Sequence, residues 1–278
     1  MADQLSKQPP STTSFILSYP AQYVVLVTIN RPDAMNSIPS YAHWEAESIF
    51  SWFDQEPSLR VAIISGAGPK AFCAGQDLIE QAKFKVQPPS AATARHPPSG
   101  FCGISRRTGK KPIIAAVNGF ALGGGFEICL NCDMVVASPK ASFGLPEATV
   151  GLYAAAGGLP RIVRNCGLQI ASEVAMTGRR LTPQEALNFH LINKISKTPE
   201  SVIAESVEMA QKIASLSPDA IIITRHGLRE AWETGSVERA TQRTSDRFDL
   251  LLRDAPNMKI GLDAFAAKKK PQWVPSKI

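Results

Sequence analysis

The chain has 278 residues, of which 44% are hydrophobic, and a formal net charge of +6 at pH 7. That length and apolar content can bury a substantial core, and no run approaches the ~20 consecutive apolar residues of a membrane span. The positive excess is modest and much of it lies near the C-terminus, at Lys268, Lys269, Lys270 and Lys277. It supports nucleic-acid binding only weakly and fits an anionic small molecule at least as well.

The N-terminal stretch MADQLSKQPPSTTSF has neither the apolar centre of a signal peptide nor the arginines of a mitochondrial transit sequence. We therefore expect a soluble, non-secreted protein with a loose N-terminal tail and no membrane partner.

Four apolar, β-branched runs predict short strands in the first half, most of them buried on both faces. They are residues 23–30, 60–66, 112–119 and 134–139. Helical segments separate them, so the pattern predicts an α/β arrangement with crossovers.

One intervening helix is predicted over residues 41–56, with Tyr41, Trp44, Ile49, Trp52 and Phe53 near one face and acidic charges mostly elsewhere. The next segment, from Lys83 to Arg107, is polar and rich in proline, which is typical of a mobile loop or lid.

The second half is predicted to be helical, and one helix has a clear start signal. Thr182 as N-cap, Pro183 at the first helical position and Glu185 three residues after the cap form a capping box. His190 falls where this helix should stop, and we interpret it as structural. The remaining histidines, His43, His96 and His226, lack a partner motif, so none is assigned as a general base.

The five cysteines are an odd number scattered among small apolar neighbours, which indicates reduced thiols rather than a disulfide framework. Cys129 and Cys132 spell C-x-x-C, but no second pair and no nearby histidine accompany them. We therefore expect two buried thiols and no metal site.

Three consecutive glycines, Gly123 to Gly125, follow a predicted strand and open a helix, and Glu127 comes two residues later. Free backbone N–H groups at a positive helix end suit negative charge. The spacing matches neither common nucleotide-phosphate motif, which leaves an oxyanion as the candidate.

A second acid, Glu147, lies twenty residues after Glu127, and the small-residue segment 154–158 follows it. Two carboxylates and a backbone anion hole could perform proton transfer next to a carbonyl.

Three motifs in this order and spacing carry a family resemblance: INRPDAMNS, KAFCAGQDL, and the long run from AAVNGFALGGGFE to LPEATVGL. Together they resemble the enoyl-CoA hydratase/isomerase (crotonase) superfamily over almost the whole chain. The resemblance implies an α/β spiral of ββα units over residues 12–200, which would hold the active site. It also implies a C-terminal helical region over residues 201–272 that serves in trimerisation, giving a homotrimer or a dimer of trimers.

The resemblance also assigns roles in the site. The backbone N–H groups of Gln76 and Gly124 would form the oxyanion hole for the thioester oxygen of an acyl-CoA. Glu127 would be the base that activates water toward the β-carbon, and Glu147 the acid that protonates the α-carbon.

Further contacts to substrate or CoA are implied at Ala34, Ala74, Asp77, Leu78, Leu122, Gly123, Pro146 and Ala155. Two positions depart from the family pattern. Asp33 replaces a frequent lysine near the CoA nucleotide, and Ala155 stands where a glycine amide would touch the water.

The predicted reaction is hydration of a 2-enoyl-CoA or the reverse dehydration, with no cofactor beyond the CoA of the substrate. The enzymatic alternative is an enoyl-CoA or dienoyl-CoA isomerase. The presence of both acids disfavours it. A non-enzymatic RNA-binding homologue is also disfavoured, because the helix over residues 41–56 has no lysine or arginine.

The last three residues, Ser276, Lys277 and Ile278, resemble the Ser-Lys-Leu address read by the peroxisomal import receptor. They predict a peroxisomal location, and otherwise a cytoplasmic one. Two prolines and the preceding lysines predict that this tail is exposed to solvent.

Overall fold

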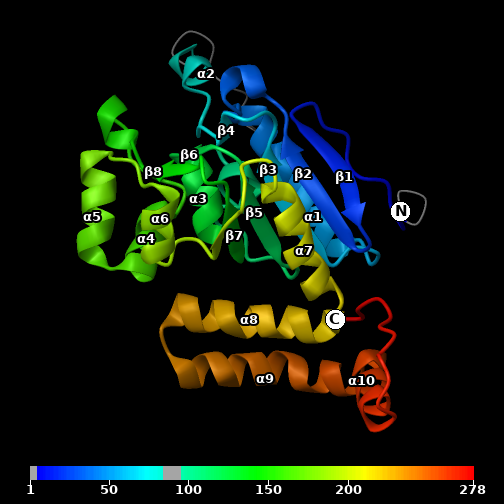
Figure 1. Cartoon of the computed structure of the whole chain (residues 1–278). Helices are drawn as coiled ribbons and strands as arrows, with labels where there is room; N and C mark the ends of the chain where they lie inside the picture. Colours follow the sequence, from blue (N-terminus) through cyan, green and yellow to red (C-terminus); the bar gives the residue numbers. More distant parts are fainter. Residues whose placement is uncertain (1–4, 84–94) are drawn as a thin grey trace.

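The computed structural model describes residues 5–83 and 95–278 and has two sheets joined by a repeated crossover (Figure 1). The larger sheet runs in the order β1-β2-β3-β5-β7-β9, and the smaller runs β4-β6-β8. In the larger sheet β1 is antiparallel to β2 and all other pairs are parallel. The strands are β1 (Phe15–Ala21), β2 (Val24–Ile29), β3 (Val61–Gly66), β4 (Ala71–Cys73), β5 (Ile113–Val117), β6 (Phe120–Leu122), β7 (Met134–Ala137), β8 (Ser142–Gly144) and β9 (Lys194–Ile195).

Successive chain segments place one strand in the large sheet, the next in the small sheet, and then form a helix. The turn β3-β4 leads to α2 (Leu78–Lys83), and the turn β5-β6 leads to α3 (Gly124–Asn131). This repeat is the predicted ββα spiral. All four predicted strands are present, as β2, β3, β5 and β7, and every residue of β5 is buried.

The remaining helices fall into two groups. Around the spiral lie α1 (Ser40–Gln55), α4 (Gly158–Cys166), α5 (Leu168–Thr177), α6 (Pro183–Asn188) and α7 (Val202–Ala214), which packs against β2, β3, β5 and β7. Beyond the spiral lie α8 (Pro218–Thr234), α9 (Val237–Asp254) and α10 (Pro256–Ala266), drawn below it in Figure 1. No helix in the described ranges is both long and apolar enough for a membrane span.

The helix α1 departs from its predicted apolar face at the N-terminal end. Ile49, Trp52 and Phe53 are buried as expected, but Tyr41 is 46% exposed and Trp44 36% exposed. The buried positions of the first turns are instead the small Ala42 and Ala46, together with His43. The hydrophobic pattern predicted that the largest side chains would point inward. Close packing in the first turns of α1 instead favours small side chains.

The predicted start and stop of α6 are confirmed. The Thr182 side chain accepts a hydrogen bond from the Glu185 amide, and the Glu185 carboxylate accepts one from the Thr182 amide. His190 adopts a left-handed backbone with φ of 60°, as expected for a residue that ends a helix.

Residues 95–107 of the predicted loop are irregular apart from one short 3₁₀ turn, as expected, but their apolar side chains are buried; residues 84–94 lie outside the described ranges. Phe101–Gly103 form a 3₁₀ turn that packs against α1, and Phe101, Cys102 and Ile104 are fully or nearly fully buried. Prolines in this segment limit regular structure without preventing burial of its apolar residues.

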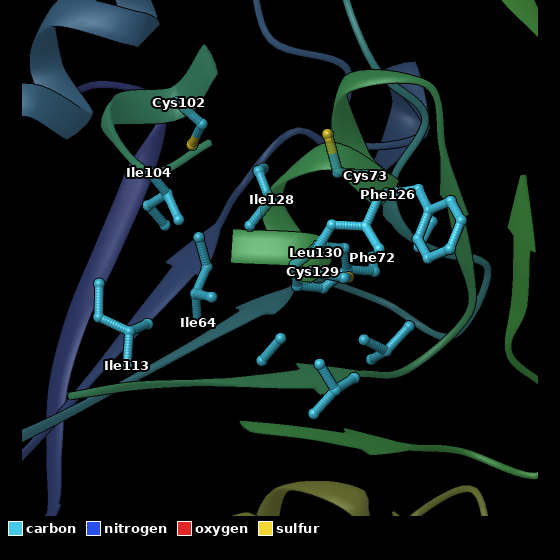
Figure 2. Close-up of a cluster of buried hydrophobic side chains, with 14 of the residues drawn as sticks. Ile64, Phe72, Cys73, Cys102, Ile104, Ile113, Phe126, Ile128, Cys129 and Leu130 are labelled. Carbon is cyan, nitrogen blue, oxygen red and sulfur yellow. The ribbon is translucent and has the colours of Figure 1, made fainter. Parts of the chain in front are cut away.

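The helix α3 lies inside the core, where its side chains meet residues from both sheets and from the 3₁₀ turn. Figure 2 shows Phe126, Ile128 and Leu130 of α3 among Ile64, Phe72, Cys102 and Ile104. Cys129 and Cys73 are buried in the same cluster as free thiols, and burial raises the pKa of Cys73 to about 12. In the described part of the chain no group of three or more potential ligands could hold a metal ion.

Asp133, just after α3, joins the two halves of the protein. Arg225 of α8 donates from Nε to its Oδ2 at 3.0 Å, and Arg229 donates from Nη2 to its Oδ1 at 2.9 Å. Arg229 also donates to the Asn131 backbone carbonyl at the end of α3, at 2.6 Å. Burial raises the pKa of Asp133, but the two arginines outweigh it and hold that pKa below its usual value.

The predicted exposure of the C-terminal tail holds only in part: Gln272, Val274, Pro275 and Lys277 are exposed, whereas Trp273, Ser276 and Ile278 are half-buried. The Trp273 indole donates to the Ser215 carbonyl at 3.0 Å, and Val274 exchanges two hydrogen bonds with the Asn257 side chain. Ser276 Oγ donates to the buried Asp219 carboxylate. An extended chain can dock without forming a helix, so prolines alone do not indicate exposure.

Candidate active site

Two glutamates from different turns of the spiral border one cavity of about 380 Å³. Glu127 lies in the first turn of α3 and is buried, and its Oε1 accepts a hydrogen bond from the Gly158 amide at 2.8 Å. Glu147 begins a 3₁₀ turn at residues 147–150, and its Oε2 is buried without a hydrogen-bond partner among the described residues. The sequence prediction that these acids share a site is consistent with this geometry.

The environment shifts both carboxyl pKa values upward. Burial, reinforced by the charge of Glu147, raises the pKa of Glu127 to about 7 despite the hydrogen bond from Gly158. Burial also raises the pKa of Glu147. A carboxyl group with a pKa near neutrality can both accept and return a proton at physiological pH, as a general acid or base must.

Each residue of the glycine run meets a different constraint. Gly123 has φ of 56° and ψ of −127°, outside the allowed regions for other residues. A Cβ on Gly124 would lie 2.6 Å from the Phe101 ring, and a Cβ on Gly125 would lie 2.0 Å from the backbone carbonyl oxygen of Cys73. The run therefore turns the chain into α3 and lets that helix pack directly on β4.

We expect Gly125→Ala to destabilise the fold by ~1–3 kcal/mol or more, because the neighbour that must move is backbone. Gly227→Ala is the matched control, since its Cβ would meet only ordinary contacts at 3.5 Å from Thr244. Urea denaturation followed by circular dichroism measures both. Equal stability of the two variants would show that α3 can shift away from β4 without cost.

Two residues whose backbone amides lack hydrogen-bond partners among the described residues line the same cavity. Gln76 and Gly124 both line it, and Gly75 brings their segments together, since a Cβ there would be 3.4 Å from the Gly124 amide nitrogen. The Gln76 amide donates no hydrogen bond to any described residue, and Gly124 is the first residue of α3, where amides lack intrahelical partners. The arrangement suits an oxyanion at a positive helix end.

The cavity includes most of the residues that the sequence placed in the site. In addition to the four already described, it is lined by Ala74, Leu78, Gly123, Pro146 and Ala155. Ala34, Asp77 and Leu122 are not among its lining residues. Asp77 instead forms an ion pair with Arg31 at 3.0 Å and accepts a hydrogen bond from the Glu80 amide in the first turn of α2.

Three aromatic residues of the cavity wall were missed as site residues. His43, His96 and Phe101 form an edge-to-face cluster, with the His43 ring centroid 4.5 Å from that of His96 and 4.6 Å from that of Phe101. His43 comes from α1, and His96 and Phe101 come from the part of the predicted loop that packs against it. No local motif links positions so far apart in sequence, so only the fold reveals the cluster.

Comparisons with known proteins agree on one family. The family model described as enoyl-CoA hydratase/isomerase matches residues 20–276. A mevalonyl-coenzyme A hydratase from Beauveria bassiana is 43% identical over 278 residues, covering 98% of this chain and 99% of the relative. A carnitinyl-CoA dehydratase from Proteus mirabilis is 36% identical over 257 residues, covering 90% and 94%.

Solved structures give the same result. An enoyl-CoA hydratase from Mycobacterium marinum superposes with a TM-score of 0.84 at 29% identity, covering 96% of this chain and 99% of that one. A carnitinyl-CoA hydratase from Mycobacterium avium superposes with a TM-score of 0.72 at 34% identity, covering 95% and 99%.

Proposed function

The chain belongs to the enoyl-CoA hydratase/isomerase family and is a hydro-lyase of acyl-CoA thioesters, and from this premise we propose that it interconverts a 2-enoyl-CoA and the corresponding 3-hydroxyacyl-CoA. The observation that carries this proposal is the pair of carboxyl residues, Glu127 and Glu147, which line one cavity together with Gln76 and Gly124. Adding water to a conjugated thioester requires one group to remove a proton and another to supply one.

In the proposed hydration, Glu127 as carboxylate removes a proton from water while the oxygen bonds to the β-carbon. The electron pair of the double bond moves to the thioester oxygen, where the amides of Gln76 and Gly124 stabilise the negative charge. Glu147 then donates a proton to the α-carbon. Proton transfer from Glu127 back to Glu147 through water restores the enzyme, and the net change is the addition of one water molecule.

For the acyl group we propose a β-methyl-branched chain with a further hydroxyl, as in mevalonyl-CoA. The support is the identity of 43% over nearly the full length of a relative named for that substrate, against 36% for one named for carnitinyl-CoA. The test is a panel of dehydrated mevalonyl-CoA, carnitinyl-CoA and crotonyl-CoA, with loss or gain of the conjugated thioester absorbance as readout.

We expect turnover of the dehydrated mevalonyl-CoA with the highest kcat/KM of the panel. Preference for another member would change the proposed acyl group and leave hydration in place. Turnover of a 3-enoyl-CoA with no loss of any conjugated thioester would instead favour the isomerase alternative and refute hydration.

We propose a homotrimer, or a dimer of such trimers, as the working assembly. Large apolar side chains are exposed on the three C-terminal helices: Leu228, Val237, Leu250, Leu251, Leu262 and Phe265. Size-exclusion chromatography with multi-angle light scattering measures the mass of the assembly. A monomer at micromolar concentration would contradict the proposal.

We propose that Ser276-Lys277-Ile278 direct the enzyme to peroxisomes by binding the import receptor. Lys277 is exposed, whereas Ser276 contacts Asp219 and the Ile278 carbonyl accepts a hydrogen bond from Lys110 at 3.0 Å. A reporter carrying the last dozen residues is expected in peroxisomes, and the enzyme lacking the final three is expected to be active and cytosolic. A diffuse reporter would contradict the assignment.

A further inference from the structure

His43, on the buried wall of the cavity, has its tautomer fixed by a backbone donor. The Cys102 amide donates to His43 Nδ1 at 3.0 Å, so Nδ1 carries no proton. Burial, and then the neighbouring His96, lowers the pKa of His43 to about 3, which leaves the ring neutral at physiological pH. A neutral imidazole with an unprotonated Nδ1 carries its hydrogen on Nε2.

This hydrogen orients the side chain of Gln76. His43 Nε2 lies 2.9 Å from Gln76 Oε1, and because Nε2 must donate, the atom it faces must be the carbonyl oxygen. The chain of hydrogen bonds from the Cys102 amide through the His43 ring therefore fixes which end of the Gln76 carboxamide is the NH₂ group. That group donates to no residue in the described ranges, and Gln76 lines the cavity.

The Gln76 side chain lies near the expected position of the thioester, because its own backbone amide belongs to the oxyanion pair. His43 is 1% exposed and Phe101 2% exposed, and the Phe101 ring packs against Gly124. His43 and Phe101 therefore lie on the buried side of the Gln76 and Gly124 backbone amides. The CoA nucleotide is too large for the cavity and must extend toward solvent, so the buried side receives the acyl group.

We propose that the Gln76 carboxamide, positioned by His43, donates a hydrogen bond from Nε2 to a hydroxyl oxygen of the acyl chain beyond the reacting double bond. Gln76 is then a specificity-determining residue, and His43 is its positioning residue. An apolar chain would leave the amide donor buried without a partner, which disfavours its binding. The inference rests on the hydratase function proposed above and adds the class of acyl group.

The test compares two substrates that differ only in the distal hydroxyl: 5-hydroxy-3-methylpent-2-enoyl-CoA and 3-methylpent-2-enoyl-CoA. We expect the wild type to prefer the hydroxylated substrate by at least about tenfold in kcat/KM. Gln76→Met keeps the backbone amide and the side-chain length but removes the donor. It should lower kcat/KM for the hydroxylated substrate by about 10- to 100-fold and change the other by less than about threefold.

Gln184→Met, at an exposed position on α6, is the matched control and should leave both values unchanged. Gln76→Ala repeats the test if the methionine does not fit, and His43→Phe should reduce the same selectivity. The wild-type selectivity should also stay constant from about pH 5 to 9, since His43 is neutral throughout.

Equal losses for both substrates in the Gln76 variants would overturn the proposal, because they would indicate damage to the oxyanion pair. A wild type that hydrates both substrates equally well would also overturn it, and the hydratase function would stand. Failure to hydrate either substrate or crotonyl-CoA would refute the function itself.

Discussion

Replacing Glu147 with glutamine is expected to lower kcat for hydration by ~10²- to 10⁴-fold, the usual contribution of a general acid or base. The amide keeps the shape of the side chain but cannot donate the proton that the α-carbon requires. A Cβ on Gly123 would lie 3.2 Å from Glu147 Oε1, which places this carboxyl group beside the glycine run that opens α3. Steady-state kinetics with the substrates above measure the effect.

Binding separates the chemical role of Glu147 from a structural one. A saturated acyl-CoA should bind Glu147→Gln within a few-fold of the wild-type affinity, as measured by calorimetry. Glu208→Gln changes an exposed glutamate on α7 and should leave kcat unchanged. A decrease of only a few-fold in kcat for Glu147→Gln would show that another group supplies the proton.

For Glu127→Gln we expect a similar loss of kcat, together with loss of a pH dependence. Hydration needs Glu127 as a carboxylate, and its pKa of about 7 means that kcat/KM in the wild type should fall as the pH drops below about 7. The residual activity of the variant should lack this fall. An unchanged acidic limb in Glu127→Gln would assign the titration to a different group.

The same variant should be more stable than the wild type at alkaline pH. The pKa of Glu127 is about 7 in the folded protein against 4.5 for an unperturbed glutamate, so between these values the native state binds a proton that the unfolded chain has released. Stability therefore falls as pH rises from about 4.5 to 7. Glu127→Gln should gain up to roughly 3 kcal/mol at pH 8 and much less at pH 5, measured by urea denaturation.

The sequence predicted those features that are encoded within one continuous segment. The β-branched runs marked β2, β3, β5 and β7, and the capping box marked the start of α6. The GGG-x-E order placed Glu127 one turn after free amides, since a helix fixes that relationship locally. The motif order supplied Glu147 and Gln76, which the fold brings to the same cavity.

What the sequence did not show depends on pairs that meet only after folding. His43 and Gln76 are separated by 33 residues, and His43 and Cys102 by 59. Their hydrogen bonds decide the tautomer of one side chain and the orientation of the other, and no periodicity encodes either. The docked part of the tail was missed for a related reason, because Asn257 and Asp219, which bind it, lie in helices whose charge pattern gives no sign of a docked chain.

The ion pairs of Asp133 with Arg225 and Arg229 have a consequence for how the protein unfolds. Glu127 stands in the first turn of α3, and the arginines of α8 hold the last residue of that helix and the aspartate just beyond it. Freeing α8 would leave the half-buried Asp133 carboxylate without its two cations, which is unfavourable because a carboxylate partly removed from water needs a charged partner. Local opening of α8 is thereby coupled to loss of α3, so the spiral and α8 should unfold as one cooperative unit.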